Sequence, residues 1–213
     1  ACRRAGNTPQ NATPAVAQLT KRLAGRFPQH RFFITAYLTT RQAPRDTLPP
    51  NTGVLVSAME LPMKADFNKG KKAKTFAKLV ADWRKAVTHV YVWDYIRNFD
   101  DYLTPWPCLR LVQQRLRWYR DMGVDGIFLN GSGQSYAALD DVQTHTLACL
   151  LRDPEARVDT CVAGYLERHY PVAGRTLARH YLSWEDEVLR RRATVPWYGG
   201  IGDAVKAWLD PDG

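Results

Sequence analysis

The sequence lacks several features that would point to a particular class of protein. It has no run of about eighteen apolar residues, and its first residues show neither the apolar stretch nor the cleavage site of a signal peptide. The four cysteines, Cys2, Cys108, Cys149 and Cys161, lack the paired spacing of a zinc site, and the histidines form no Ser-His-Asp arrangement. We therefore predict no membrane span, no export signal, no metal ion, no disulfide and no organic cofactor.

The length of 213 residues and the hydrophobic content of 45% suit one domain with an ordinary core, with or without an appendage. The first residue is Ala rather than Met. We therefore expect a processed or truncated piece of a longer protein.

The charge balance is basic, with thirty Lys and Arg against twenty-one Asp and Glu and a formal net charge of +9. Such a charge attracts polyanions, so a non-catalytic polyanion-binding module is one hypothesis. The only dense basic run is Lys69, Lys71, Lys72 and Lys74, which begins an expected helix. A solvated helix face explains this run better than a nucleic-acid site.

Four short, nearly continuous apolar segments are typical of parallel strands that are covered on both faces. They are residues 31–38, 53–59, 89–95 and 124–130. Apolar residues at helical spacing lie between them, near 71–87 and near 109–121. A first helix is expected to begin with Thr13 as its N-cap and Pro14 at its first position. Strands that alternate with helices predict a parallel sheet.

The rest of the sequence predicts helices alone, near 135–151, 158–169, 172–191 and 202–209. Four strands are too few to close a barrel and leave two open edges. An open nucleotide-binding sheet would carry a Gly-rich phosphate turn, which residues 131–133 match too weakly to count. We therefore predict an α/β fold, with the C-terminal half of a (β/α)₈ barrel over 1–134 and a helical region over 135–213. The other barrel half is the expected partner.

The most informative segment for function is residues 91–107, where an apolar strand ends in Trp93, Asp94 and Tyr95 and enters a polar loop that includes Asn98. In a barrel, ligands bind at the carboxyl ends of the strands. Flat aromatic rings cover the C–H face of a sugar, and Asp and Asn hydrogen-bond to its hydroxyls. The segment therefore suits carbohydrate. The alternative is that the two aromatics belong to the core and that Asp94 caps a helix.

Polar side chains also follow the other strands. Glu60 comes directly after the second segment, Tyr37 ends the first and Asn130 ends the last. Glu60 and Asp94 could form an acid-base pair at neighbouring strand ends, or one of them could simply bind a hydroxyl. Tyr37 and Asn130 are predicted to line the same site.

Four motifs occur in an order that resembles the bacterial domain-of-unknown-function family 4838 (DUF4838), which is linked to glycoside hydrolase family 163. They are ITAYLTT, VLVSAMELPM, YVWDYIRNFDDYLTPWP and RWYRDMGVDGIFLNG, and the resemblance covers most of residues 1–185. The third motif carries it most strongly.

The resemblance implies a (β/α)₈ barrel that hydrolyses β-N-acetylglucosaminyl linkages in N-glycans, with the substrate's own acetamide as nucleophile. It also implies a periplasmic, cell-surface or secreted location. The general acid of related barrels follows the fourth strand, which places it in the missing N-terminal half. An inverting uronidase-like hydrolase, with Glu60 and Asp94 flanking a water, is a further alternative.

Overall fold

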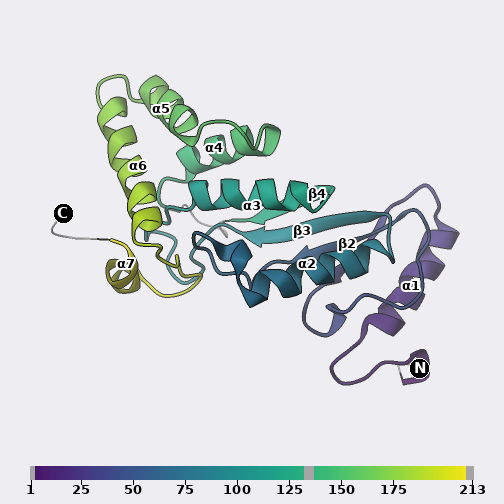
Figure 1. Ribbon diagram of the computed structural model, residues 1–213. Helices are drawn as coiled ribbons and strands as arrows, with labels where there is room; N and C mark the ends of the chain where they lie inside the picture. The colour runs from purple at the N-terminus through teal and green to yellow at the C-terminus, as the bar shows by residue number, and fades with distance from the viewer. Residues whose placement is uncertain (1–2, 132–136, 210–213) are drawn as a thin grey trace. The chain divides into compact units, whose positions relative to one another are not determined.

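The structure is a computed structural model that describes residues 3–131 and 137–209 (Figure 1). It is an α/β fold with a four-stranded parallel sheet followed by helices, which confirms the predicted fold class. The chain divides into two compact units that alternate along the sequence. The sheet unit comprises Ala1–Leu61, Asn68–Asp94 and Tyr119–Leu129, and the helical unit comprises Pro62–Phe67, Tyr95–Trp118 and Asn130–Gly213. The single boundary at residues 134 and 135 stays a prediction.

The strands follow their order in the sequence across the sheet. They are β1 (Phe32–Ala36), β2 (Thr52–Ser57), β3 (His89–Tyr95) and β4 (Gly126–Asn130). β1 and β3 both pair with β2 in parallel. β1 and β4 are therefore the edge strands of this sheet.

Helices cover one face of the sheet. In the sheet unit these are α1 (Thr13–Arg26) and α2 (Lys71–Arg84), and α3 (Leu109–Asp121) reaches this unit with its last turn. Beneath them lie fully buried strand residues such as Val54, Val56, Val90 and Val92. Burying one such side chain stabilises the fold by about 1.5–3 kcal/mol. Figure 1 shows α2 running along the sheet on this side.

The helical unit contains α4 (Asp140–Arg152), α5 (Val158–His169), α6 (Gly174–Arg190) and α7 (Ile201–Ala207). The α4–α5 and α5–α6 connections are short, and α5 packs on both α4 and α6. Short 3-10 turns occur at Arg3–Ala5, Leu38–Thr40 and Phe67–Lys69. No helix in the described parts of the chain is both long and apolar enough to cross a bilayer.

The predicted elements agree closely with the observed ones, and β3 and α3 have the predicted bounds. The first residues of the helix expected near 135 fall outside the described residues. One detail was wrong, because Thr13 is the first helical residue rather than the cap. Its hydroxyl donates to the carbonyl of Gln42, while the Asn11 side chain accepts the Thr13 N–H. A side chain that a distant segment engages is not available to cap its own helix.

Candidate functional site

Within the described residues of the sheet unit, one face of the sheet carries no helix, and we call it the open face. Successive side chains of a strand point to opposite faces, so each strand sends alternate residues to this side. In β3 the outward residues are half-buried, whereas the valines between them are fully buried under the helices. The strand pairing then places the open-face residues in rows across the sheet. These residues are Phe33, Thr35, Gly53, Leu55, Ser57, His89, Tyr91, Trp93, Gly126 and Phe128.

Aromatic rings dominate the open face. The Phe33 ring lies 4.8 Å from that of Tyr91, and the Trp93 ring lies 5.7 Å from Tyr37 and 6.3 Å from Phe128, between centroids. Phe33 remains 40% exposed and Phe128 50% exposed. Large apolar side chains on a strand normally face the core, so their exposure here marks a surface that can bind a ligand or another part of a protein.

Two glycines make room for these rings. A Cβ at Gly53 would lie 2.4 Å from the Phe33 ring, and one at Gly126 would lie 2.9 Å from the Tyr91 ring. The rings of Phe33 and Tyr91 therefore lie over the backbones of the neighbouring strands. A strand glycine often marks such a close approach.

Two of the predicted binding residues lie at the carboxyl end of this face. Trp93 and Tyr37 contact each other, and the Tyr37 hydroxyl lies 3.9 Å from the Met59 sulfur. Asn130 is the last residue of β4 and belongs to the helical unit. The structure thus brings Tyr37 and Trp93 together, and Phe128 completes an aromatic cluster with them.

Asp94 points to the opposite face from its neighbour Trp93. It is 1% exposed, and the Tyr119 hydroxyl of α3 donates a hydrogen bond of 2.7 Å to its carboxylate. Tyr119 is itself fully buried against Phe76 of α2. The carboxylate therefore lies in the layer between sheet and helices. This placement favours the structural role, and a catalytic role for Asp94 stays a prediction.

Glu60 lies in the loop after β2 in a different environment. Its side chain is 61% exposed and forms an ion pair with Arg41 at 3.0 Å. An exposed pair of this kind contributes little to stability, so this carboxylate is held loosely and is accessible to solvent.

Tyr95 and Asn98 belong to the helical unit and organise its loop. The Tyr95 ring packs edge-on against Phe99 and Trp197, with centroids 5.8 and 5.7 Å away. The Asn98 side chain accepts the backbone N–H groups of Asp100 and Asp101 and donates to the carbonyl of Gly199. Both residues are buried. Their interactions hold the loop together, and a contact with sugar is not needed to explain their presence.

A buried carboxylate that the sequence analysis missed lies in the helical unit. Glu185 of α6 is 1% exposed and accepts the backbone N–H groups of Leu109 and Arg110 at 2.9 and 3.0 Å. It thereby caps the start of α3 from another helix. Burial raises the pKa of Glu185 to about 7, although these two N–H groups act in the opposite direction.

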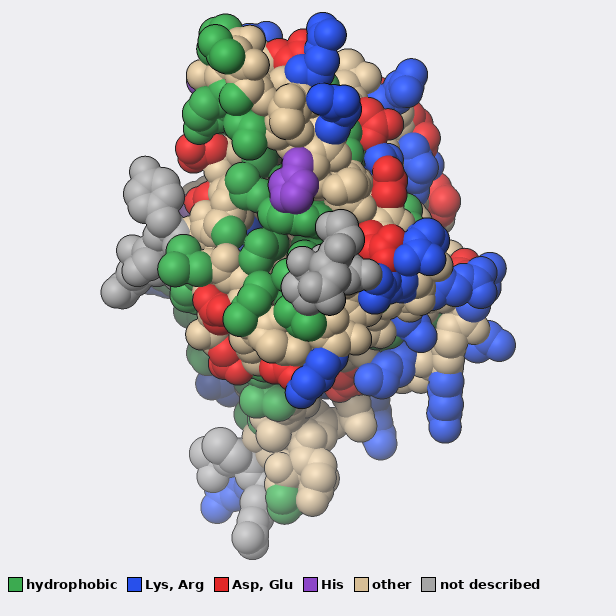
Figure 2. Space-filling model, turned by 90° about the vertical axis from the view of Figure 1, so that its left-hand side faces the viewer, with side chains coloured by type: hydrophobic (Ala, Val, Ile, Leu, Met, Phe, Trp, Pro, Cys, Tyr) green, Lys and Arg blue, Asp and Glu red, His purple; other side chains and the backbone are tan. Residues whose placement is uncertain are grey.

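The helical unit also contains a partly open cavity of about 510 Å³ between α4, α5 and α6. Its walls are largely apolar and include the aromatic side chains of Tyr165, Tyr170, Tyr181 and Trp184. Figure 2 views the molecule from the side on which α6 lies in Figure 1, and it shows hydrophobic side chains grouped at the surface there. Within the described residues, no cluster of three or more His, Cys, Asp or Glu side chains could hold a metal ion.

A comparison with protein-family models identifies the family to which the chain belongs. The model of a domain of unknown function, DUF4838, matches residues 4–183, a range that includes all four strands. The chain belongs to the DUF4838 family. Comparisons with curated proteins and with solved structures gave no match. For this DUF4838 chain, the open aromatic face is the strongest candidate for a functional surface.

Proposed function

We propose that this DUF4838 chain contributes a sugar-binding wall to the barrel of a glycoside hydrolase that acts on β-N-acetylglucosaminyl linkages. The observation that carries the proposal is the cluster of Tyr37, Trp93 and Phe128 near the carboxyl ends of parallel strands, on the face without helices. Ligands of parallel α/β folds bind at that end of the sheet. The resemblance to glycoside hydrolase family 163 supports the substrate class.

The chemistry of the cluster suits a pyranose. Aromatic rings pack against the C–H groups of one sugar face, and Asn130, the last residue of β4, carries an amide donor and acceptor that suit a sugar hydroxyl. Of the two candidate carboxylates, Glu60 is accessible to solvent and could orient a hydroxyl or an acetamide of the substrate. A ligand that breaks the Arg41–Glu60 ion pair would then also find the Arg41 guanidinium available.

We further propose that a second set of strands completes the barrel. β1 and β4 are the edges of the sheet, and the aromatic rings between them remain partly exposed. Exposed edges and apolar sheet faces are liabilities that proteins normally cover. In this proposal the covering strands also bring the general acid.

The purified chain is expected to be inactive on chitobiose-linked glycans, and joining it to a family member's N-terminal barrel half should restore hydrolysis. Release of reducing sugar, measured for both proteins, checks this prediction. Turnover by the chain alone at the rate of the joined protein would overturn the proposed incompleteness.

A Trp93→Ala variant should weaken chitobiose binding by about tenfold to a hundredfold, because a stacking aromatic contributes roughly 1–3 kcal/mol through its buried area. Isothermal titration of the joined protein measures this change. Phe33→Ala is the matched control, since Phe33 lies on the same face near the amino end of β1. Equal losses from both variants would indicate a general packing effect and would count against a sugar site at Trp93.

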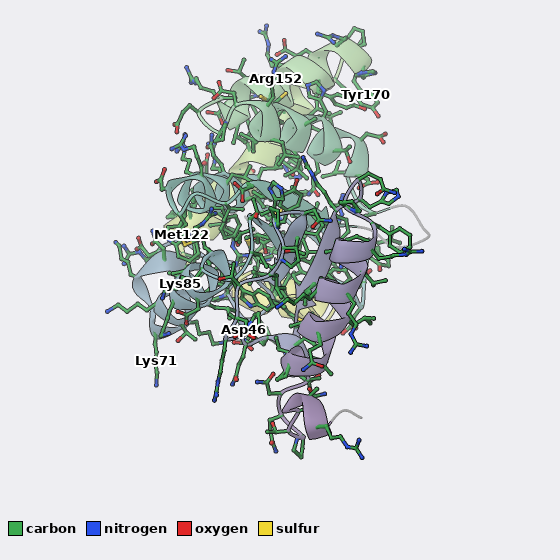
Figure 3. The ribbon with its side chains drawn as sticks, turned by 90° about the vertical axis from the view of Figure 1, so that its right-hand side faces the viewer. Asp46, Lys71, Lys85, Met122, Arg152 and Tyr170 are labelled. Carbon is green, nitrogen blue, oxygen red and sulfur yellow. The ribbon has the colours of Figure 1, made fainter. Side chains whose placement is uncertain are left out.

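A polyanion-binding module is the second candidate, favoured by the exposed lysines at the start of α2. Figure 3 labels Lys71, which is the first residue of this helix, and Lys85, which follows its last residue. No acidic residue in the first turn balances them. If this function is correct, affinity for heparin should fall steeply between 50 and 200 mM salt, on the order of tenfold or more, whereas sugar binding should change little.

A further inference from the structure

Two cysteines lie at matching positions of the α4–α5 hairpin. Residues 153–157 connect the helices, which pack on each other. The His145 ring of α4 lies 5.1 Å from the Tyr165 ring of α5, and this contact sets their register. Cys149 follows His145 by four residues, and Cys161 precedes Tyr165 by four. Four residues are about one helical turn, so in antiparallel helices both cysteines lie one turn closer to the connection.

The two thiols are near neighbours. Cys149 lies close enough to Cys161 to contribute to its raised pKa, and both side chains are half-buried rather than enclosed. His145 Nε2 lies 3.8 Å from Cys149 Sγ. Arg152, labelled in Figure 3, marks the end of α4 just beyond Cys149. The site therefore combines a thiol pair, a neighbouring base and access for a small reagent.

We propose that Cys149 and Cys161 are a modification site, at which a small-molecule disulfide such as oxidised glutathione converts the two thiols into a disulfide linking α4 to α5. The sequence-based prediction of no disulfide stays a prediction, because cysteine spacing alone does not show which residues a hairpin brings together.

The reaction proceeds in two exchange steps. The Cys149 thiolate attacks one sulfur of oxidised glutathione, which forms a mixed disulfide and releases one glutathione thiolate. The Cys161 sulfur, after losing its proton, attacks the Cys149 sulfur and releases the second glutathione. Two protein thiols and one glutathione disulfide thus become one protein disulfide and two glutathiones.

The environment assigns the first attack to Cys149. The imidazole of His145 can accept its proton, whereas burial, followed by the contact with Cys149, raises the pKa of Cys161 to about 11. A thiol that stays protonated at neutral pH is a poor initial nucleophile. It can still resolve the mixed disulfide that forms on Cys149.

The bond would join two walls of the cavity in the helical unit. Tyr165 and Leu166 of α5 line that cavity together with Val142 of α4. The link closes a short loop, since Cys149 and Cys161 are 12 residues apart (161 − 149). Closing a loop of roughly this size stabilises the folded state, so oxidation should raise the melting temperature by about 6–12 °C.

Peptide mapping tests the proposal. The chain is incubated with oxidised glutathione or with dithiothreitol, alkylated, and digested with trypsin without reduction. After oxidation we expect the segments 121–152 and 158–168, which contain Cys149 and Cys161, to be recovered as one linked species. The species should be absent after dithiothreitol treatment and in a Cys161→Ser variant.

Three further measurements make the result decisive. A Cys2→Ser variant is the matched control and should still form the link. The rise in melting temperature should disappear in Cys149→Ser and Cys161→Ser alike, and His145→Gln should slow oxidation by about tenfold without changing its final extent. Separate glutathione adducts on the two cysteines with no linked species, or a linked species with no gain in melting temperature, would overturn the proposal.

Discussion

A Glu185→Ala variant is expected to unfold with a free energy about 2–4 kcal/mol lower than that of the parent chain at pH 5. The substitution leaves the first two N–H groups of α3 without their acceptor inside the protein. A buried donor without a partner costs roughly 1–3 kcal/mol. Urea unfolding followed by circular dichroism measures the difference.

The loss should shrink as pH rises. Since burial raises the pKa of Glu185 from 4.5 to about 7, the folded state holds a proton that the unfolded state releases. The stability that this group contributes is fully present below pH 4.5 and is lost as pH rises through about 7. The difference amounts to about 3 kcal/mol in the parent chain, an order-of-magnitude figure from the shift.

Glu185→Gln separates the charge from the hydrogen bonds. Glutamine keeps one acceptor oxygen for α3 and does not titrate, so this variant should be less dependent on pH between 5 and 8 than the parent. Glu187→Gln is the matched control on the same helix. Arg190 and Arg191 hold the pKa of Glu187 at about 2, below the range of the measurement. A parent chain whose stability stays constant from pH 5 to 8 would contradict the raised pKa of Glu185.

The regular elements could be predicted because their signals are local. The bounds of β3 follow from an apolar segment, and those of α3 from apolar residues at helical spacing. The partners of Tyr95 and Asn98 could not be predicted in this way. Their contacts reach Trp197 and Gly199, about a hundred residues further along the chain. No local pattern encodes such a pairing.

The opposite faces of Trp93 and Asp94 did have a signal in the sequence. In HVYVWDY, Asp94 is in phase with Val90 and Val92, whereas Trp93 is in phase with His89 and Tyr91. The alternation therefore separates the two residues that the sequence analysis assigned to one site. The alternation does not predict which residue donates a hydrogen bond to Asp94, since Tyr119 comes from a helix that begins after the intervening loop.

Tyr119→Phe should lower the free energy of unfolding by about 1.5–3 kcal/mol, because it removes a hydroxyl donor from a carboxylate that is 1% exposed. Asp94→Asn should cost less, since the amide oxygen can still accept from Tyr119. Chemical denaturation of both single variants and of the double variant yields the coupling between the two side chains. A coupling of about 1 kcal/mol or more is expected for a structural pair.

The same variants decide whether Asp94 takes part in catalysis. A carboxylate that contacts the sugar would make Asp94→Asn lower kcat/KM of the joined protein by about a hundredfold, or roughly 2.7 kcal/mol of transition-state stabilisation, with folding preserved. A carboxylate held by Tyr119 predicts the reverse, with reduced stability and near-normal turnover of the folded fraction. Tyr119→Phe sharpens the distinction, because Tyr119 is buried between sheet and helices and cannot reach substrate directly. If Asp94→Asn and Tyr119→Phe lose stability while Trp93→Ala alone loses affinity, the functional surface is the open face. Asp94 then stabilises the sheet from its helix-covered face.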